Sequence, residues 1–149
     1  MTPKEAAAAL AEVDRTEHKL AEHARWPFHR HAMFGLSEGL IIAAVAQPIA
    51  IGASMTAAAL ALLTVCITED RRRHGMFVSG LRTGATLPLT IMLFLFLLAM
   101  LLASLMVRDG VSAQPLGYLM GGIAFAVCTA ASLRWENIYR AELAGRGQR

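Results

Sequence analysis

The chain has 149 residues, of which 56% are hydrophobic and 17% are charged, and its mean hydropathy is +0.48. This hydropathy is high for a soluble domain and ordinary for a small membrane protein that crosses the bilayer several times. The formal net charge of +3 is compatible with nucleic-acid binding, but the placement of the basic residues favours a membrane instead. The length allows one membrane domain and excludes a second folded unit of similar size.

The first 31 residues are predicted to form a cytosolic and interfacial unit. Residues 3–25 carry a thin apolar face at helical spacing, and Thr2 precedes them as a capping residue. They therefore predict an amphipathic helix that packs on a partner copy, on cytosolic loops or on lipid; a partly ordered solvated helix is an equal alternative. The next segment, RWPFHRH, is predicted to be an interfacial elbow, because Trp26 and Phe28 suit the headgroup region.

The longest apolar stretch predicts a transmembrane helix at 85–107. No charged residue lies between Arg82 and Arg108, so the stretch has no polar stripe. Its helical length of about 34 Å is enough to cross a hydrocarbon layer about 30 Å thick.

Residues 33–68 are apolar but too long for one crossing. The turn-forming residues Gln47, Pro48 and Gly52 near the middle predict a hairpin, and a single tilted helix or a re-entrant pair is the alternative. A fourth apolar run follows the turn at residues 108–115. The fold class is thus predicted to be all-α, a polytopic bundle of two hairpins over 32–134 followed by a cytosolic tail at 135–149; its four spans lie at about 32–47, 52–68, 85–107 and 116–133.

The basic residues predict the orientation. Thirteen of the fourteen Lys and Arg residues lie before the first span, between the second and third, or after the fourth; only Arg108 lies in the other set of loops. The positive-inside rule then places both termini in the cytoplasm of a bacterial inner membrane. The same charges favour anionic lipid headgroups and need no nucleic acid.

Glu38 is the strongest candidate for chemistry inside the membrane. A carboxylate near the bilayer centre costs at least about 2.5–3.5 kcal/mol, so such groups usually face a cavity or a partner. Glu38 could bind a proton or a cation, with His31 or Arg82 as its partner. The alternative is a shallow Glu that reaches toward cytoplasmic water.

Two further patterns concern packing and lipid. Small residues one helical turn apart occur in two predicted spans and predict close helix packing, within this bundle or in a dimer; they are Gly35 and Gly39 in one span, and Gly117 and Gly121 in the other. A basic cluster after the second span marks the end of that span and is a candidate contact for anionic lipid or a partner; it comprises Arg71, Arg72, Arg73 and His74.

The sequence offers no catalytic, metal or cofactor pattern. The five histidines lie outside the predicted spans, which disfavours a membrane haem, and neither HExxH nor CxxC occurs. Cys66 and Cys128 lie in apolar runs and are expected to be packing residues rather than a disulfide. We expect no cofactor, no metal and no enzymatic activity.

Two stretches carry a resemblance, EAAAALAEVDRTEHKLAEHARWPFHRHAMFGLSEGLIIAAVAQP at 5–48 and EDRRRHGMFVSGLRTG at 69–84. Together they resemble a group of small four-helix bacterial inner-membrane proteins for which no activity is assigned. The resemblance implies the topology and the location, and it carries over no functional residues. Four spans with Glu38 in the first also resemble small multidrug transporters, a likeness that rests on Glu38 alone.

The leading functional prediction is a non-enzymatic membrane subunit. It would act as an accessory, regulatory or homo-oligomeric component through helix association, with its cytosolic helix and basic loop as contact surfaces. The alternative is a proton-coupled exporter of small cationic solutes that works as a dimer through Glu38.

Overall fold

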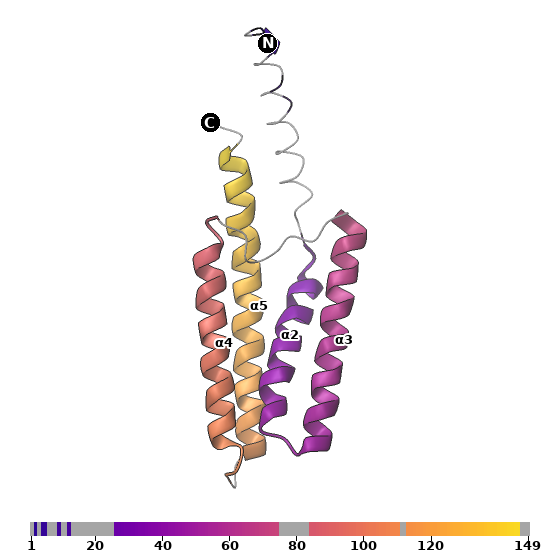
Figure 1. The fold of residues 1–149 in the computed structure, drawn as a ribbon, viewed down its shortest axis with the longest axis vertical. Helices are drawn as coiled ribbons and strands as arrows, with labels where there is room; N and C mark the ends of the chain where they lie inside the picture. The colour runs from indigo at the N-terminus through magenta and orange to yellow at the C-terminus, as the bar shows by residue number, and fades with distance from the viewer. Residues whose placement is uncertain are drawn as a thin grey trace.

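The computed structural model describes residues 26–74, 84–110 and 113–146, and in the first twelve residues only positions 2, 4, 5, 9 and 12. The described chain is helical, with α2 (Phe28–Val45), α3 (Ile49–His74), α4 (Leu87–Val107) and α5 (Ala113–Arg146). Figure 1 shows the four helices side by side with their long axes nearly parallel. The all-α bundle of two hairpins predicted from hydropathy is therefore present.

Three of these helices are long and apolar enough to cross a membrane. They are Ile49–Arg72, Leu87–Val107 and Gln114–Glu142. α2 is not among them, because His29, Arg30 and His31 in its first turn, together with Glu38, make its 18 residues less apolar than the other three helices. At about 1.5 Å per residue it is about 27 Å long, slightly shorter than a typical hydrocarbon layer.

The observed helix bounds correct the predicted ones at most ends. Pro27 is the N-cap of α2, so Phe28 to His31 form the first helical turn and not a separate elbow. α3 begins at Ile49, three residues before the predicted start at Gly52. A Cβ on Gly52 would approach the Ala44 carbonyl oxygen to 2.6 Å, so this glycine lets the two helices of the hairpin approach closely. α5 continues to Arg146, because neither glycine nor proline occurs between Leu133 and Gly145, and the predicted tail is mostly helix.

The predicted helix 3–25 lies almost entirely outside the described residues. Lys4, Glu5, Ala9 and Glu12 are helical. The Thr2 amide donates to the Glu5 carboxylate at 2.7 Å, and the Glu5 amide donates to the Thr2 hydroxyl at 3.4 Å. This reciprocal pair is a capping box, the pattern expected at a helix N-terminus.

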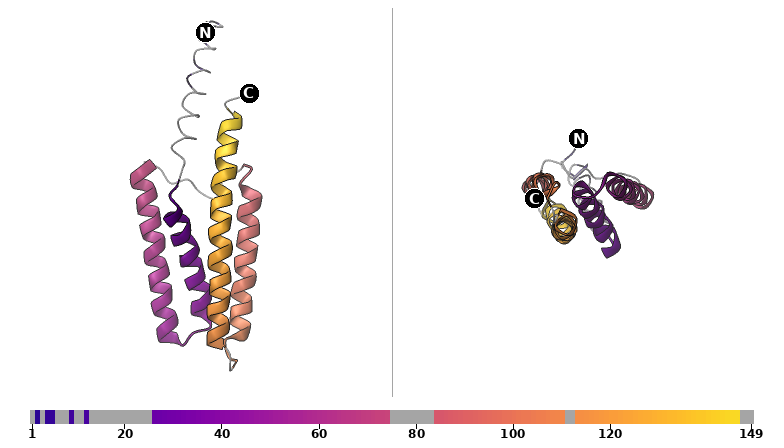
Figure 2. Two further views of the ribbon diagram at one scale, coloured as in Figure 1. Left: turned by 180° about the vertical axis from the view of Figure 1, so that it is seen from behind. Right: turned by 90° about the horizontal axis from the view of Figure 1, so that it is seen from below.

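The two hairpins meet through α2 and α5. α2 packs most extensively against α5 and then against α3, while α4 packs on α5 and, less, on α2. α3 and α4 do not form a packed pair among the described residues. The end view in Figure 2 shows α2 between α3 on one side and α4 with α5 on the other.

Candidate functional site

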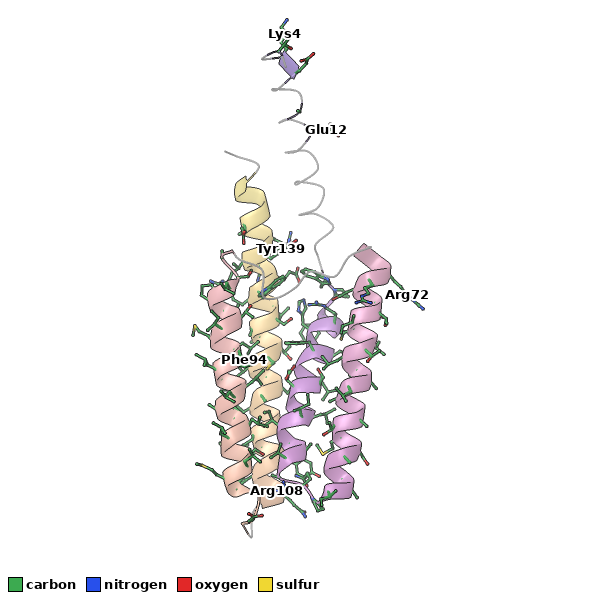
Figure 3. All side chains as sticks on the ribbon, in the orientation of Figure 1. Lys4, Glu12, Arg72, Phe94, Arg108 and Tyr139 are labelled. Carbon is green, nitrogen blue, oxygen red and sulfur yellow. The ribbon has the colours of Figure 1, made fainter. Side chains whose placement is uncertain are left out.

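One end of the bundle gathers the polar side chains. We call it the basic end: α2 begins there, α3 ends there, and Arg72 lies at it, whereas Arg108 lies at the opposite end (Figure 3). The basic end contains an aromatic cluster of Trp26, Trp135 and Tyr139. Trp26 lies 6.0 Å from Trp135 and 6.1 Å from Tyr139, and the Trp135 and Tyr139 rings stack at 5.1 Å between centroids. These contacts join the segment before α2 to the C-terminal half of α5.

Arg30 and Asp70 form a part-buried ion pair beside this cluster, in which Asp70 is the buried partner. The Arg30 Nη2 donates to Asp70 Oδ2 at 2.8 Å, and its Nε lies 3.3 Å from both carboxylate oxygens. The guanidinium also lies over the Trp26 ring, 4.8 Å from its centroid. A two-pronged Arg–carboxylate pair is well oriented, so it ties α2 to α3 and leaves little net charge at this position.

His31 connects α2 to α5 through two hydrogen bonds. Its Nδ1 lies 2.8 Å from Ser132 Oγ, and its Nε2 lies 2.9 Å from Glu136 Oε2. In the neutral form Nε2–H donates to the carboxylate and Nδ1 accepts from the Ser132 hydroxyl, so all three groups are satisfied.

The structure corrects the predicted pairing of His31 with Glu38. The two residues are seven positions apart on one helix, about 10 Å along its axis, and the imidazole turns to α5 instead. Glu38 is half-buried, and it has no hydrogen-bond or ion-pair partner in the part of the chain that the structure describes. Its other suggested partner, Arg82, lies outside the described residues.

The four glycines selected from the sequence face one another across α2 and α5. A Cβ on Gly39 would lie 2.6 Å from the Gly121 carbonyl oxygen, and one on Gly121 would lie 2.7 Å from the Ala43 Cβ. Gly35 lies against Phe125 and Thr129, and Gly117 lies against Ala46 and Gln47. The absence of side chains at these positions therefore lets the two helix backbones approach closely, within this bundle.

The basic cluster after the second predicted span is only partly described. Arg71 and Arg72 are exposed, as a lipid or partner contact requires. The side chains of Arg73 and His74 lie outside the described set. Their neighbours Glu69 and Asp70 face α2, where His29 lies 3.6 Å from Glu69.

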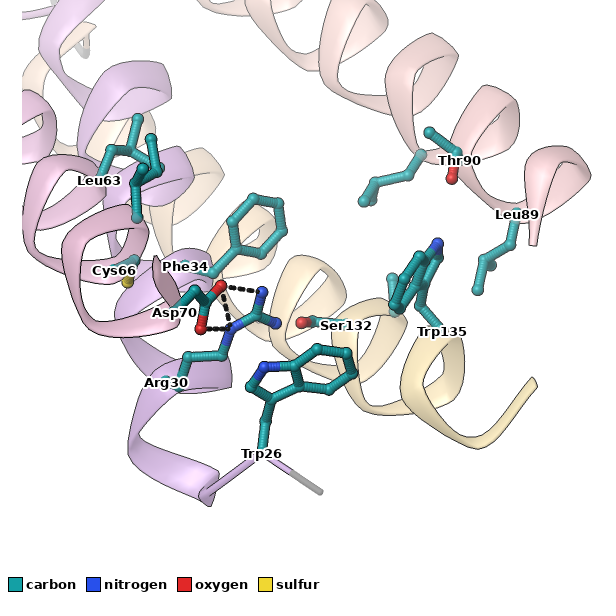
Figure 4. A pocket seen from close by; sticks show the side chains of 13 residues that line it. Trp26, Arg30, Phe34, Leu63, Cys66, Asp70, Leu89, Thr90, Ser132 and Trp135 are labelled. Carbon is teal, nitrogen blue, oxygen red and sulfur yellow. Dashed lines mark hydrogen bonds and ion pairs between the residues drawn. The ribbon is translucent and has the colours of Figure 1, made fainter. Parts of the chain in front are cut away.

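A pocket of about 260 Å³ opens beside the Arg30–Asp70 pair. Its lining comes from α2, α3, α4 and α5 and from Trp26. In Figure 4 Leu63 and Cys66 lie on one side of it, and Leu89 and Thr90 lie on the other, with the ion pair and the two tryptophans between them. Apart from the ion pair, most of the lining side chains are apolar.

The opposite end brings the turn between α2 and α3 against the start of α5. The Gln47 Nε2 donates to the Gln114 carbonyl oxygen at 3.2 Å. A second hollow is lined by residues of that turn, by the first residues of α5, and by Arg108 and Asp109. This contact ties the two hairpins at the end away from the basic side chains.

The described residues contain no group of three His, Cys, Asp or Glu side chains that could hold a metal ion. Cys66 and Cys128 are both buried free thiols. The main polar contacts, Arg30 with Asp70 and His31 with Ser132 and Glu136, were not anticipated from the sequence. The spacing of Ser132 and Glu136 could have indicated a polar contact, because residues four positions apart lie on one face of a helix.

No known protein family, curated protein or solved structure matches this chain.

Proposed function

We propose that the chain is a four-span protein of the bacterial inner membrane with both termini in the cytoplasm. The basic end would then face the cytoplasm, and Arg108 the outside. α2 would be the fourth span, shielded from lipid by α3 and α5; among the described residues it is the helix with the largest fraction of buried positions, including Gly35, Gly39 and Ala43. Arg71 and Arg72 would contact anionic headgroups on the cytoplasmic side.

Within that membrane we propose a non-enzymatic accessory or regulatory role through helix association. The observation that supports it is the loose attachment of α4, in which Ser104 is the buried residue. Met92, Phe94 and Met106 on α4 are each at least 65% exposed. Such a helix offers a long lateral face to another transmembrane helix, either of a second copy or of a different membrane protein.

Photocrosslinking in native membranes tests this proposal. A photoreactive residue at Phe94 on α4 is expected to give one discrete adduct, of twice the chain mass or with one partner. The same group at Leu60 on α3, which is 56% exposed, is the matched control and is expected to give lipid adducts only. Lipid adducts alone at both positions, together with a bare monomer by native mass spectrometry, would contradict the proposal.

The second candidate is a dimeric, proton-coupled exporter of small cationic or amphipathic solutes. It is favoured by Glu38, a half-buried carboxylate without a hydrogen-bond or ion-pair partner among the described residues. Such a group can bind a proton or a cation in turn. Two copies are required, because four short spans are too few to enclose a pathway.

Transport in proteoliposomes separates this candidate from the first. Under an imposed pH gradient, the wild-type protein is expected to move at least one member of a panel of lipophilic cations, and Glu38→Gln is expected to abolish that movement. Equal inactivity of both proteins toward the whole panel would exclude the exporter. It would leave the accessory role standing.

A further inference from the structure

The pocket beside the Arg30–Asp70 pair lies where two outer helices fail to meet. Its walls include Leu63 and Ile67 from α3, and Leu89 and Leu93 from α4. α3 and α4 do not form a packed pair in the described chain. In a bilayer this pocket would therefore face the hydrocarbon region sideways, between the two helices, and would not face water.

The charges at the pocket exclude a simple ionic ligand. Arg30 already contacts both oxygens of Asp70, so neither group is free to bind a separate anion or cation. Breaking this pair would leave the buried Asp70 carboxylate without its partner, which is unfavourable. The part of a ligand that occupies the pocket is therefore expected to be uncharged.

The volume of the pocket distinguishes a hydrocarbon chain from a partner helix as the apolar ligand. A volume of about 260 Å³ lies just below the range of about 300–1,000 Å³ typical of small-ligand sites. A transmembrane helix of a partner, about 10 Å wide, would not fit such a space. A flexible hydrocarbon chain would fit it.

The two tryptophans set the depth of the pocket. Trp26 and Trp135 both line it at the basic end, and indole rings concentrate at the headgroup level of membranes. Leu63 lies seven residues before Asp70 on α3, and Leu93 lies four residues after Leu89 on α4, so the apolar walls extend from the basic end toward the middle of the bundle. An acyl chain that starts at the glycerol level would follow the same direction.

We propose that this pocket binds one acyl chain of a membrane glycerophospholipid, which fills the gap between α3 and α4. A free fatty acid is a poorer match, because its carboxylate would need a cation and Arg30 is occupied by Asp70. This inference depends on the membrane location of the chain. It does not depend on whether α4 has a protein partner or on whether Glu38 transports a proton.

Native mass spectrometry of the detergent-purified, delipidated protein tests the proposal after addition of phosphatidylethanolamine. About one retained lipid per chain is expected. Ala131 lines the pocket, whereas its neighbour Ala130 is exposed on α5. Ala131→Leu should displace about two methylene groups and lower the affinity about tenfold, and Ala130→Leu should not change it.

Tryptophan fluorescence provides a second measurement, because the chain has two tryptophans and both line the pocket. In nanodiscs of phosphatidylcholine with brominated acyl chains, we expect strong quenching in the wild type and in Ala130→Leu. Quenching should be weaker in Ala131→Leu. Leu63→Phe fills the pocket from α3, with Leu60→Phe as its exposed control, and covers the case in which Ala131→Leu fails to fold.

Three outcomes would overturn the proposal. One is a purified protein that retains no added phospholipid. Another is equal retention and quenching in the pocket-filling variants and their exposed controls. The third is selective retention of oleate over phosphatidylethanolamine, which would assign the site to free fatty acid instead.

Discussion

At the scale of single residues, His31 is the most constrained polar group described. Its side chain is fully buried, and both ring nitrogens are hydrogen-bonded to α5. Glu136 and Ser132 depend on the imidazole in return, since both are buried as well. A buried hydrogen-bonded group stabilises a fold mainly because its removal leaves a buried partner without a hydrogen bond, which lowers the free energy of unfolding.

We predict that His31→Leu lowers the free energy of unfolding in detergent micelles by about 2–4 kcal/mol, because the Glu136 carboxylate loses its donor. The double variant His31→Leu/Glu136→Leu should regain a large part of that loss, since both polar partners are then replaced. Denaturant titration followed by circular dichroism measures both values. His29→Leu is the control, because His29 is exposed. A loss below about 0.5 kcal/mol for His31→Leu would show that the three groups do not stabilise the fold.

At the scale of elements, the contact between α2 and α5 holds the two hairpins together. Glycines, chiefly Gly39 and Gly121, occupy this contact, so the two helix backbones approach closely. α4 is attached with fewer contacts, among them the hydrogen bond from the Ser104 hydroxyl to the Ile42 carbonyl oxygen at 3.0 Å. The contact between α2 and α5 therefore holds the bundle together, and the outer faces of α3 and α4 remain available for contact with lipid or other helices.

Gly39→Ala is expected to destabilise the bundle by about 1–3 kcal/mol, because the added methyl group would meet the Gly121 backbone. Gly122→Ala is the matched control. Nothing lies within 4 Å of a Cβ at Gly122, so this change should be neutral or stabilising by up to about 1 kcal/mol through helix propensity alone. Thermal unfolding in the same detergent compares the two variants. Equal melting temperatures would show that the α2–α5 contact is looser than described.

At the scale of the whole molecule, charge separates the two ends of the bundle. Arg72 lies at the basic end and Arg108 at the other (Figure 3). Arg30 in the first turn of α2, Arg71 beside Arg72, and Arg134 next to Trp135 of the aromatic cluster also belong to the basic end. The helices Leu87–Val107 and Gln114–Glu142, which are long and apolar enough to cross a membrane, connect these ends. For a membrane protein with this charge distribution, the positive-inside rule predicts a cytoplasmic basic end.

Labelling of intact cells tests this orientation. In a background with Cys66→Ala and Cys128→Ala, a single cysteine at Asp109 should react with a membrane-impermeant maleimide added outside. A single cysteine at Arg72 should react only after the cells are lysed. Both positions are exposed, so any difference reflects the side of the membrane. Labelling of Arg72→Cys in intact cells would reverse the proposed topology.

The sequence by itself determined the helical class, the hairpin at Gln47-Pro48 and the two unlike ends, because hydropathy, turn residues and charge are local properties. It also identified the small residues that lie between α2 and α5. The tertiary structure decided the rest. His31 meets Ser132 and Glu136 across 101 and 105 residues, and Arg30 meets Asp70 across 40. No periodicity specifies such pairs, because they depend on which helices pack together and at what depth.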